Sequence, residues 1–149
     1  MATVYDKTGN ALAGHSSGGV NSEVLTRTNR LTIPVGSVTG DVFQVFDVDK
    51  GERVIACAMK VVQGTDQTTP IVKLGLQGGT EAGYLAYSSV LAAAEGTTYI
   101  GVGAYLGGSD IQIPFAAADT IDAELTVTGT LTIAAILDIE LITIRTTLA

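Results

Sequence analysis

The chain has 149 residues and carries 15 acidic against 8 basic side chains, which gives a formal net charge of −7 at pH 7. This acidic balance argues against binding to nucleic acid, whose phosphates must be neutralised by lysine and arginine, and against an anionic membrane surface. A single cysteine, Cys57, excludes an internal disulfide, and no charge-free apolar stretch reaches the roughly 18 residues of a membrane span.

The first thirty residues are polar and show no sustained hydrophobic period, which predicts an extended arm over 1–30 and a separate domain over 31–149. Such an arm orders either against a neighbouring subunit or along its own sheet, and the sequence leaves both open. No secretory signal is recognisable, so we expect the protein to be made in a cytoplasm. The candidate partner contacts are the arm's apolar side chains: Val4, Tyr5, Leu12, Val20, Val24 and Leu25.

Strand-like segments begin after the arm. Leu31–Val35 is short and contains a proline, which cannot donate to a strand ladder, so an edge position is expected. Val42–Val48 and Arg53–Val62 flank the turn at 49–52, where Gly51 can adopt a positive φ, and this spacing predicts a β-hairpin. The larger apolar face of the second strand is formed by Ile55, Cys57, Met59 and Val61.

The middle of the chain continues the same pattern. Ile71–Leu76 and Ile111–Phe115 read as short strands, and Thr98–Leu106 has apolar residues at every second position. Ser89–Glu95 is the one segment that could form a short helix, with a serine as N-cap and Gly96 as its stop.

The C-terminal part holds the clearest strand signals. Ile121–Val127 alternates apolar and polar residues with period two, and Leu131–Ile144 is a second apolar stretch after a break at Gly129. The pair predicts a hairpin or two neighbouring strands of an antiparallel sheet. Asp138 and Glu140 lie on the polar side of the last strand. They either form a solvated face or pair with basic residues of a neighbouring subunit.

The whole pattern predicts an all-β protein of seven to nine short strands, with at most one short helix, built as a sandwich or barrel. Charged residues make up only 15% of the chain, against about 25% in typical globular proteins. A surface with so few charges favours an oligomer or a large assembly over a free monomer.

Enzymatic and metal chemistry find little support. His15 is the only histidine and lies in a flexible polar segment, and no nucleophile elbow is present. One cysteine and one histidine do not make a zinc site. The run Asp47–Glu52 has too few oxygen ligands in the right places for a calcium loop and reads as a charged turn. We therefore predict no catalytic residues, no metal and no cofactor.

Four tyrosines leave a second functional class open. Side chains of this kind can stack on sugars, which would suit a carbohydrate- or receptor-binding module. Such modules usually present tryptophan as well, and this chain has none, so packing in the core or at an interface is the favoured role. The residues are Tyr84, Tyr87, Tyr99 and Tyr105.

Three segments, in this order, resemble the head decoration, or cement, proteins of tailed bacteriophages. They are Lys50–Ile55 at a strand-ending turn, Thr69–Val72 at the start of the next strand, and Ala118–Ala123 leading into the final strands. The resemblance covers residues 40–145.

This resemblance implies a jelly-roll-like antiparallel β-sandwich on the outer surface of a virion. The expected function is to reinforce a phage capsid by bridging subunits of the major capsid protein, and the expected oligomer is a homotrimer. An N-terminal arm could extend across the lattice by adding a strand to an exposed sheet edge. Many weak contacts repeated over the shell would then act together through multivalency.

Overall fold

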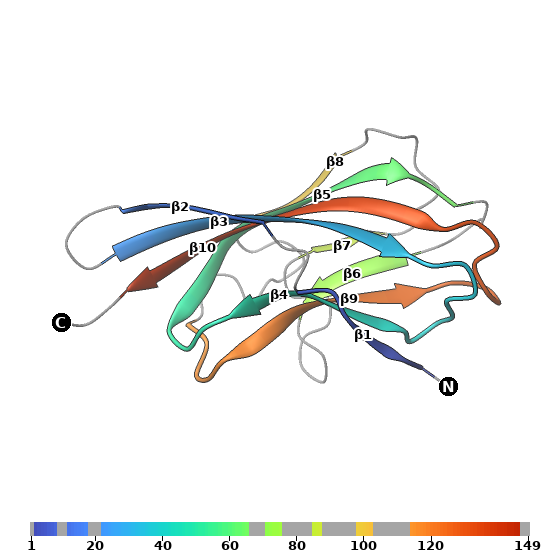
Figure 1. Cartoon of the computed structure of the whole chain (residues 1–149), viewed down its shortest axis with the longest axis horizontal. Coiled ribbons are helices and arrows are strands. Elements are labelled where there is room, and N and C mark those ends of the chain that lie inside the picture. Colours follow the sequence, from blue (N-terminus) through green and yellow to red (C-terminus); the bar gives the residue numbers. More distant parts are fainter. Residues whose placement is uncertain are drawn as a thin grey trace.

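The computed structural model describes residues 2–8, 12–17, 22–65, 71–75, 85–87, 98–102 and 114–146. These residues form ten strands in two five-stranded sheets, which lie one above the other as a sandwich in Figure 1. No α-helix occurs among them. The prediction of an all-β sandwich is confirmed. The predicted helix at Ser89–Glu95 lies outside the described residues.

The two sheets have different strand orders. The first, here called the β4 sheet, contains in order β1 (Val4–Asp6), β4 (Val42–Val48), β9 (Asp119–Thr126), β6 (Ile71–Gly75) and β7 (Leu85–Tyr87). The second, the β10 sheet, contains in order β2 (Leu12–Ser17), β3 (Ser22–Ile33), β10 (Ala135–Thr146), β5 (Glu52–Gln63) and β8 (Thr98–Val102). All the strand pairs are antiparallel except β1 with β4, which are parallel.

The core lies between the two sheets and is filled from both of them. The β4 sheet contributes inward side chains that include Phe43, Phe46, Ile121 and Leu125, and the β10 sheet contributes Leu31, Ile33, Met59, Leu137 and Ile139. All of these are at most 1% exposed. Because each sheet buries only one face, its strands alternate inward apolar and outward polar residues, which is the period-two signal in the sequence.

The predicted pairing of the last two strands is wrong. β9 pairs with β4 and β6, whereas β10 pairs with β3 and β5 in the other sheet. The segment 127–134 therefore carries the chain across the sandwich. Both strands bury one apolar face in the same core, but from opposite sides. Alternation alone specifies a buried face and says nothing about which sheet supplies it.

The hairpin predicted at 49–52 is wrong for the same reason. Its turn exists, and Gly51 has the expected positive φ of 85°, but it connects β4 in one sheet to β5 in the other. The Gly51 N–H donates to the Phe115 carbonyl, and the Phe115 N–H donates to the Glu52 carbonyl, each at 2.8 Å. These bonds satisfy backbone groups that a hairpin would have paired across its two strands.

A β-bulge in β5 changes which of its residues face the core. Cys57 pairs with Leu141 and Ala56 with Ile142, but Thr143 pairs with Val54, so Ile55 is the extra residue. Ile55 is consequently only half-buried. Val54 takes the inward position that the sequence pattern assigned to Ile55. The bulge also turns Glu52 inward, where only 2% of it is exposed.

The first thirty residues supply three strands of the sandwich. β1 lies beside β4, β2 beside β3, and β3 pairs with β10 over twelve residues from Ser22 to Ile33. The predicted boundary between residues 30 and 31 falls inside β3. These strands also account for the ten strands found, against the seven to nine expected.

Candidate interaction surface

One end of the sandwich, on the right in Figure 1, is built from residues 2–4, 34–41 and 127–134 and is called here the uncharged end. Asp41 is its only charged residue, and it is 2% exposed. The exposed surface at this end therefore consists of valine, isoleucine, proline, glycine, threonine and alanine residues.

The loops of the uncharged end are held by backbone hydrogen bonds. A β-bridge joins Val38 to Thr130, and the Gly36 N–H donates to the Leu131 carbonyl at 2.8 Å. The Thr39 hydroxyl donates to the Val127 carbonyl at 2.6 Å and accepts from the Val127 N–H at 2.9 Å. These contacts fix the two loops against each other, so the end is a preorganised surface.

Asp41 ties the N-terminal strand to this end. One carboxylate oxygen of Asp41 accepts from the Thr3 N–H at 2.8 Å, and the other accepts from the Val38 N–H at 3.0 Å. The Val42 N–H in turn donates to the Thr3 carbonyl at 2.8 Å. The buried carboxylate thus satisfies donors of two segments far apart in the sequence, which compensates its removal from water.

The exposed large apolar side chains of the described residues all lie at the uncharged end. Val35 is 61% exposed, Val4 is 48% exposed and Ile133 is 46% exposed. Single exposed apolar residues are ordinary, but a surface that gathers them and excludes charge has the composition of a binding interface.

The opposite end is organised around ion pairs and is called here the ionic end. Arg27, on the inner face of β3, donates to the Glu52 carboxylate and to the Asp47 carbonyl. Glu52 also accepts from the Thr143 hydroxyl at 2.9 Å and from the Asp49 N–H at 3.1 Å. The bulge in β5 makes this network possible, because it places Glu52 on the core side.

Arg145 extends the ionic end toward solvent. Its guanidinium lies 2.8 Å from the Asp49 carboxylate and 2.7 Å from the Glu23 carboxylate. The hydrogen bond to Glu23 is the main reason that the pKa of Arg145 is raised above its ordinary value. Both arginines, Arg27 and Arg145, are therefore paired with carboxylates within the protein.

The structure does not bring the predicted arm residues together. Val4 lies at the uncharged end, whereas Val24 and Leu25 pair with residues near the ionic end and are half-buried. Tyr5 stacks on Phe43, with ring centroids 4.8 Å apart and ring planes 10° apart, so it packs on its own core. Leu12 lies on β2, and Val20 lies outside the described residues.

Sequence reasoning missed Val35, Asp41 and Ile133. A signal was present, since 34–41 and 127–134 together hold one charged residue. Only the structure shows that these loops, about ninety positions apart, meet at one end.

Within the described part of the chain, no group of three or more histidine, cysteine, aspartate or glutamate side chains could hold a metal ion. No helix among these residues is long and apolar enough to span a membrane. Cys57 is buried, and the backbone of His15 lies on β2. The four tyrosines named as sugar-stacking candidates lie outside the described side chains.

No protein-family model and no curated protein matches the sequence, but the fold matches chains from solved phage capsids. A chain of the cyanophage Pam1 capsid asymmetric unit matches with a TM-score of 0.65 and 13% identity, over 87% of this chain and 90% of that chain. A chain of the Ralstonia phage GP4 capsid matches with a TM-score of 0.56 and 13% identity, over 98% and 100%. A chain of the acidic stable capsid of Helicobacter pylori bacteriophage KHP30 matches with a TM-score of 0.54 and 12% identity, over 89% of this chain and 92% of that chain.

At these identities the likeness is one of fold. It covers at least 87% of this chain and at least 90% of each capsid chain. The chain therefore has a β-sandwich fold that also occurs in three phage capsids.

Proposed function

We propose that this protein is a structural component of a phage virion that decorates and reinforces the outer surface of the capsid. The observation that carries the proposal is the full-length fold match to chains of three phage capsids. The resemblance of residues 40–145 to head decoration proteins supports it from the sequence. The proposed partner is the major capsid protein, and the proposed action is to bridge its neighbouring subunits.

The uncharged end is the proposed contact with the shell. Its backbone is fixed by hydrogen bonds, so binding would not have to order a loop. Val35 and Ile133 supply apolar area there, and the lack of exposed charge means that no ionic group would have to be desolvated. Of the arm residues predicted from the sequence, Val4 belongs to this contact.

A homotrimer is the proposed assembly of the protein. Three copies on one shell would multiply a weak contact, because linked binding events raise the effective concentration of the remaining ones. Light scattering after size exclusion, over a dilution series, measures the oligomer directly. A mass of three 15.3 kDa protomers supports the trimer in solution, and a mass of one protomer at every concentration contradicts it.

The function is tested by adding the purified protein to capsids of the phage that encodes it, assembled without it, and measuring co-sedimentation. We expect saturable binding and greater resistance of the bound capsids to heat or chelators. Capsids that bind none of the protein would refute the proposal.

The orientation is tested by cysteine protection. Cys57 is buried, so an introduced cysteine is the reactive one. Ile133→Cys at the uncharged end should lose reactivity to a maleimide when capsids are bound. The matched control, Lys50→Cys, lies on the exposed turn at the ionic end and should keep its reactivity. Protection of position 50 and not of position 133 would reverse the proposed orientation.

A further inference from the structure

The outer face of the β10 sheet carries a shallow trough. β5 presents two consecutive outward alanines, Ala56 and Ala58, and their small side chains leave space beside β10. One depression of about 300 Å³ is lined by Ala58, Lys60, Asp138 and Glu140. It adjoins a second, of about 180 Å³, through the shared residues Ala58 and Glu140. The second depression is the more apolar of the two, because Ala56 and Ile142 line it.

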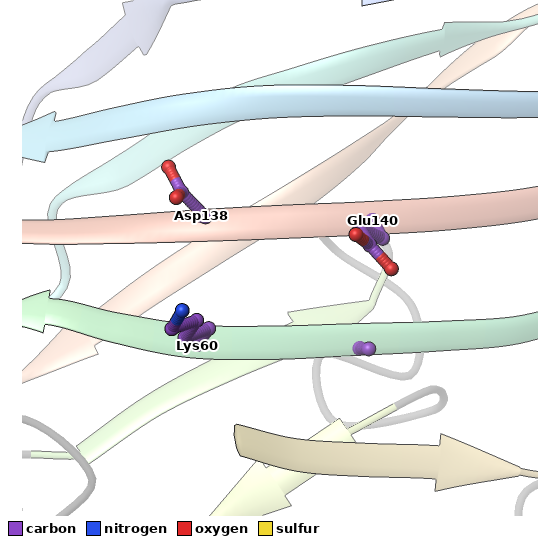
Figure 2. Close-up of a pocket in the computed structure, with 4 residues that line it drawn as sticks. Lys60, Asp138 and Glu140 are labelled. Carbon is purple, nitrogen blue, oxygen red and sulfur yellow. The ribbon is translucent and has the colours of Figure 1, made fainter. Parts of the chain in front are cut away.

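Asp138, at one side of the trough, is already neutralised. It pairs in register with Arg30 on β3 and with Lys60 on β5, which forms a row of charges across three strands. Arg30 donates to both carboxylate oxygens, at 2.7 and 2.8 Å. This hydrogen-bonded pair, with a smaller effect of Lys60, lowers the pKa of Asp138. The carboxylate of Asp138 is directed toward β3 in Figure 2.

Glu140, one register row away, has a different environment. Its neighbours in the ladders are Thr28 on β3 and Ala58 on β5, and neither carries a charge. Within the described part of the chain no side chain pairs with its carboxylate. Figure 2 shows that carboxylate on the side of β10 that faces β5, and Glu140 lines both depressions. The sheet therefore presents an unneutralised negative charge beside an apolar depression.

A lysine or arginine side chain matches both features of this arrangement. Its aliphatic stem can lie along Ala56, Ala58 and Ile142, and its cationic group can reach the Glu140 carboxylate. An acidic side chain in the same position would meet the Glu140 carboxylate in a protein whose net charge is −7. Charge complementarity thus selects a basic partner.

We infer that this trough is a subsite for a lysine or arginine side chain of a capsid subunit. The identity of the partner rests on the proposed function, whereas the subsite itself does not. A protein that bridges two subunits needs two contact surfaces, and the trough lies on the flat side of the sandwich while the uncharged end lies at its tip. One protomer could then hold one subunit with each surface.

The subsite is tested without capsids by an NMR titration of the full chain with n-butylammonium chloride, the side-chain analogue of lysine. We expect amide shifts centred on Ala56, Ala58 and Glu140, and much smaller shifts with 1-butanol at matched ionic strength. Glu140→Gln, an isosteric change at an exposed position, should remove the response to the cation. Asp47→Asn, which changes the net charge equally on the other sheet, should keep it. Shifts that are spread over the surface, equal for the alcohol, or unchanged in Glu140→Gln would overturn the subsite.

The partner is tested by capsid binding of the same variants and of Ala58→Leu, which fills the trough. We expect Glu140→Gln and Ala58→Leu to weaken binding by roughly fivefold per site, the upper range for an exposed charge pair, while Asp47→Asn binds as the parent does. Parent-like binding by both trough variants would overturn the assignment to a capsid subunit. If the parent protein binds no capsids while the NMR response is present, the proposed function fails and the subsite stands.

Discussion

The two ends of the sandwich use charge in opposite ways. At the ionic end, Arg27 and Glu52 point inward and are almost completely removed from solvent, with 12% and 2% of their side chains exposed. At the uncharged end, Asp41 is buried, and exposed apolar residues take the place of exposed charge. Charged residues make up only 15% of the chain. Some of them join strands at the ionic end, whereas the exposed surface of the uncharged end carries none.

The two ends of the sandwich are stabilised by different interactions. The loops of the uncharged end are joined by backbone hydrogen bonds and by the Thr39 hydroxyl, and none of these bonds involves the side chains of Val35 or Ile133. The side chains of Val35 and Ile133 can therefore vary with the binding partner without loss of these hydrogen bonds. At the ionic end the side chains themselves join β3, β5 and β10. Substitutions there should change stability, and substitutions at the uncharged end should change binding.

The largest effect is expected from breaking the buried pair of the ionic end. Arg27→Met leaves the Glu52 carboxylate buried without its main partner, so the free energy of unfolding should fall by about 3 kcal/mol or more. Urea denaturation at pH 7 measures this change. The double variant Arg27→Met/Glu52→Met should be less destabilised than the sum of the two single variants, because it leaves no unpaired buried charge. Strictly additive losses would show that the two side chains do not interact.

The strands themselves were well predicted from the sequence, because burial of one sheet face imposes period two. The predicted strand Val42–Val48 matches β4, and the predicted strand Arg53–Val62 lies within β5. The period-two alternation does not predict to which of the two sheets each strand belongs. The turns at 49–52 and 127–134 cross between the sheets, and no local residue pattern distinguishes such a crossing from a hairpin.

Neither the ionic network nor the uncharged end could be predicted from the sequence. Glu52 faces the core only because Ile55 is an extra residue in β5, and a bulge shifts the phase without leaving a signature in the alternation. Val35 and Ile133 come to the same end only through pairing of two loops far apart in the chain. The residues named for the N-terminal arm lie toward both ends of the sandwich, because β1 and β3 start at opposite ends.

An intermediate effect is expected from the backbone of the uncharged end. Gly40 has a φ of +91°, and a Cβ added there would lie 3.2 Å from the Cβ of Ala2. Gly40→Ala should cost about 1–2 kcal/mol from the left-handed conformation alone, with a further loss from pressing on the N-terminal segment. Gly36→Ala is the matched control, because its φ is +90° and it has nothing within 4 Å. Urea denaturation of both variants separates strain from contact, and equal losses would contradict a role for the Ala2 contact.

A smaller effect on free energy, but a specific one on binding, is expected from Ile133→Asp. The side chain is 46% exposed, so stability should stay within about 0.5 kcal/mol of the parent protein. Capsid binding should weaken by about tenfold, since an interface that excludes charge would have to bury one. Ala117→Asp adds the same charge at an exposed position beside the 49–52 turn, away from both proposed contacts, and should bind like the parent. Equal binding by both variants would remove the uncharged end from the proposed contact.

The smallest effect is expected from the exposed counterpart of the buried pair. Arg30 and Asp138 pair on the outer face of the β10 sheet, with 62% and 37% of their side chains exposed, so water and salt screen them. Because the hydrogen bond from Arg30 lowers the pKa of Asp138 below 3.8, the stabilisation is fully present above that unfolded-state value and is lost as the pH falls through the folded one. Asp138→Asn should therefore be slightly less stable than the parent at pH 7. The difference should shrink in high salt and vanish at a pH below the folded pKa. Urea denaturation across pH and salt measures it, and a loss as large as that of Arg27→Met would contradict the contrast between the inner and outer faces of β3.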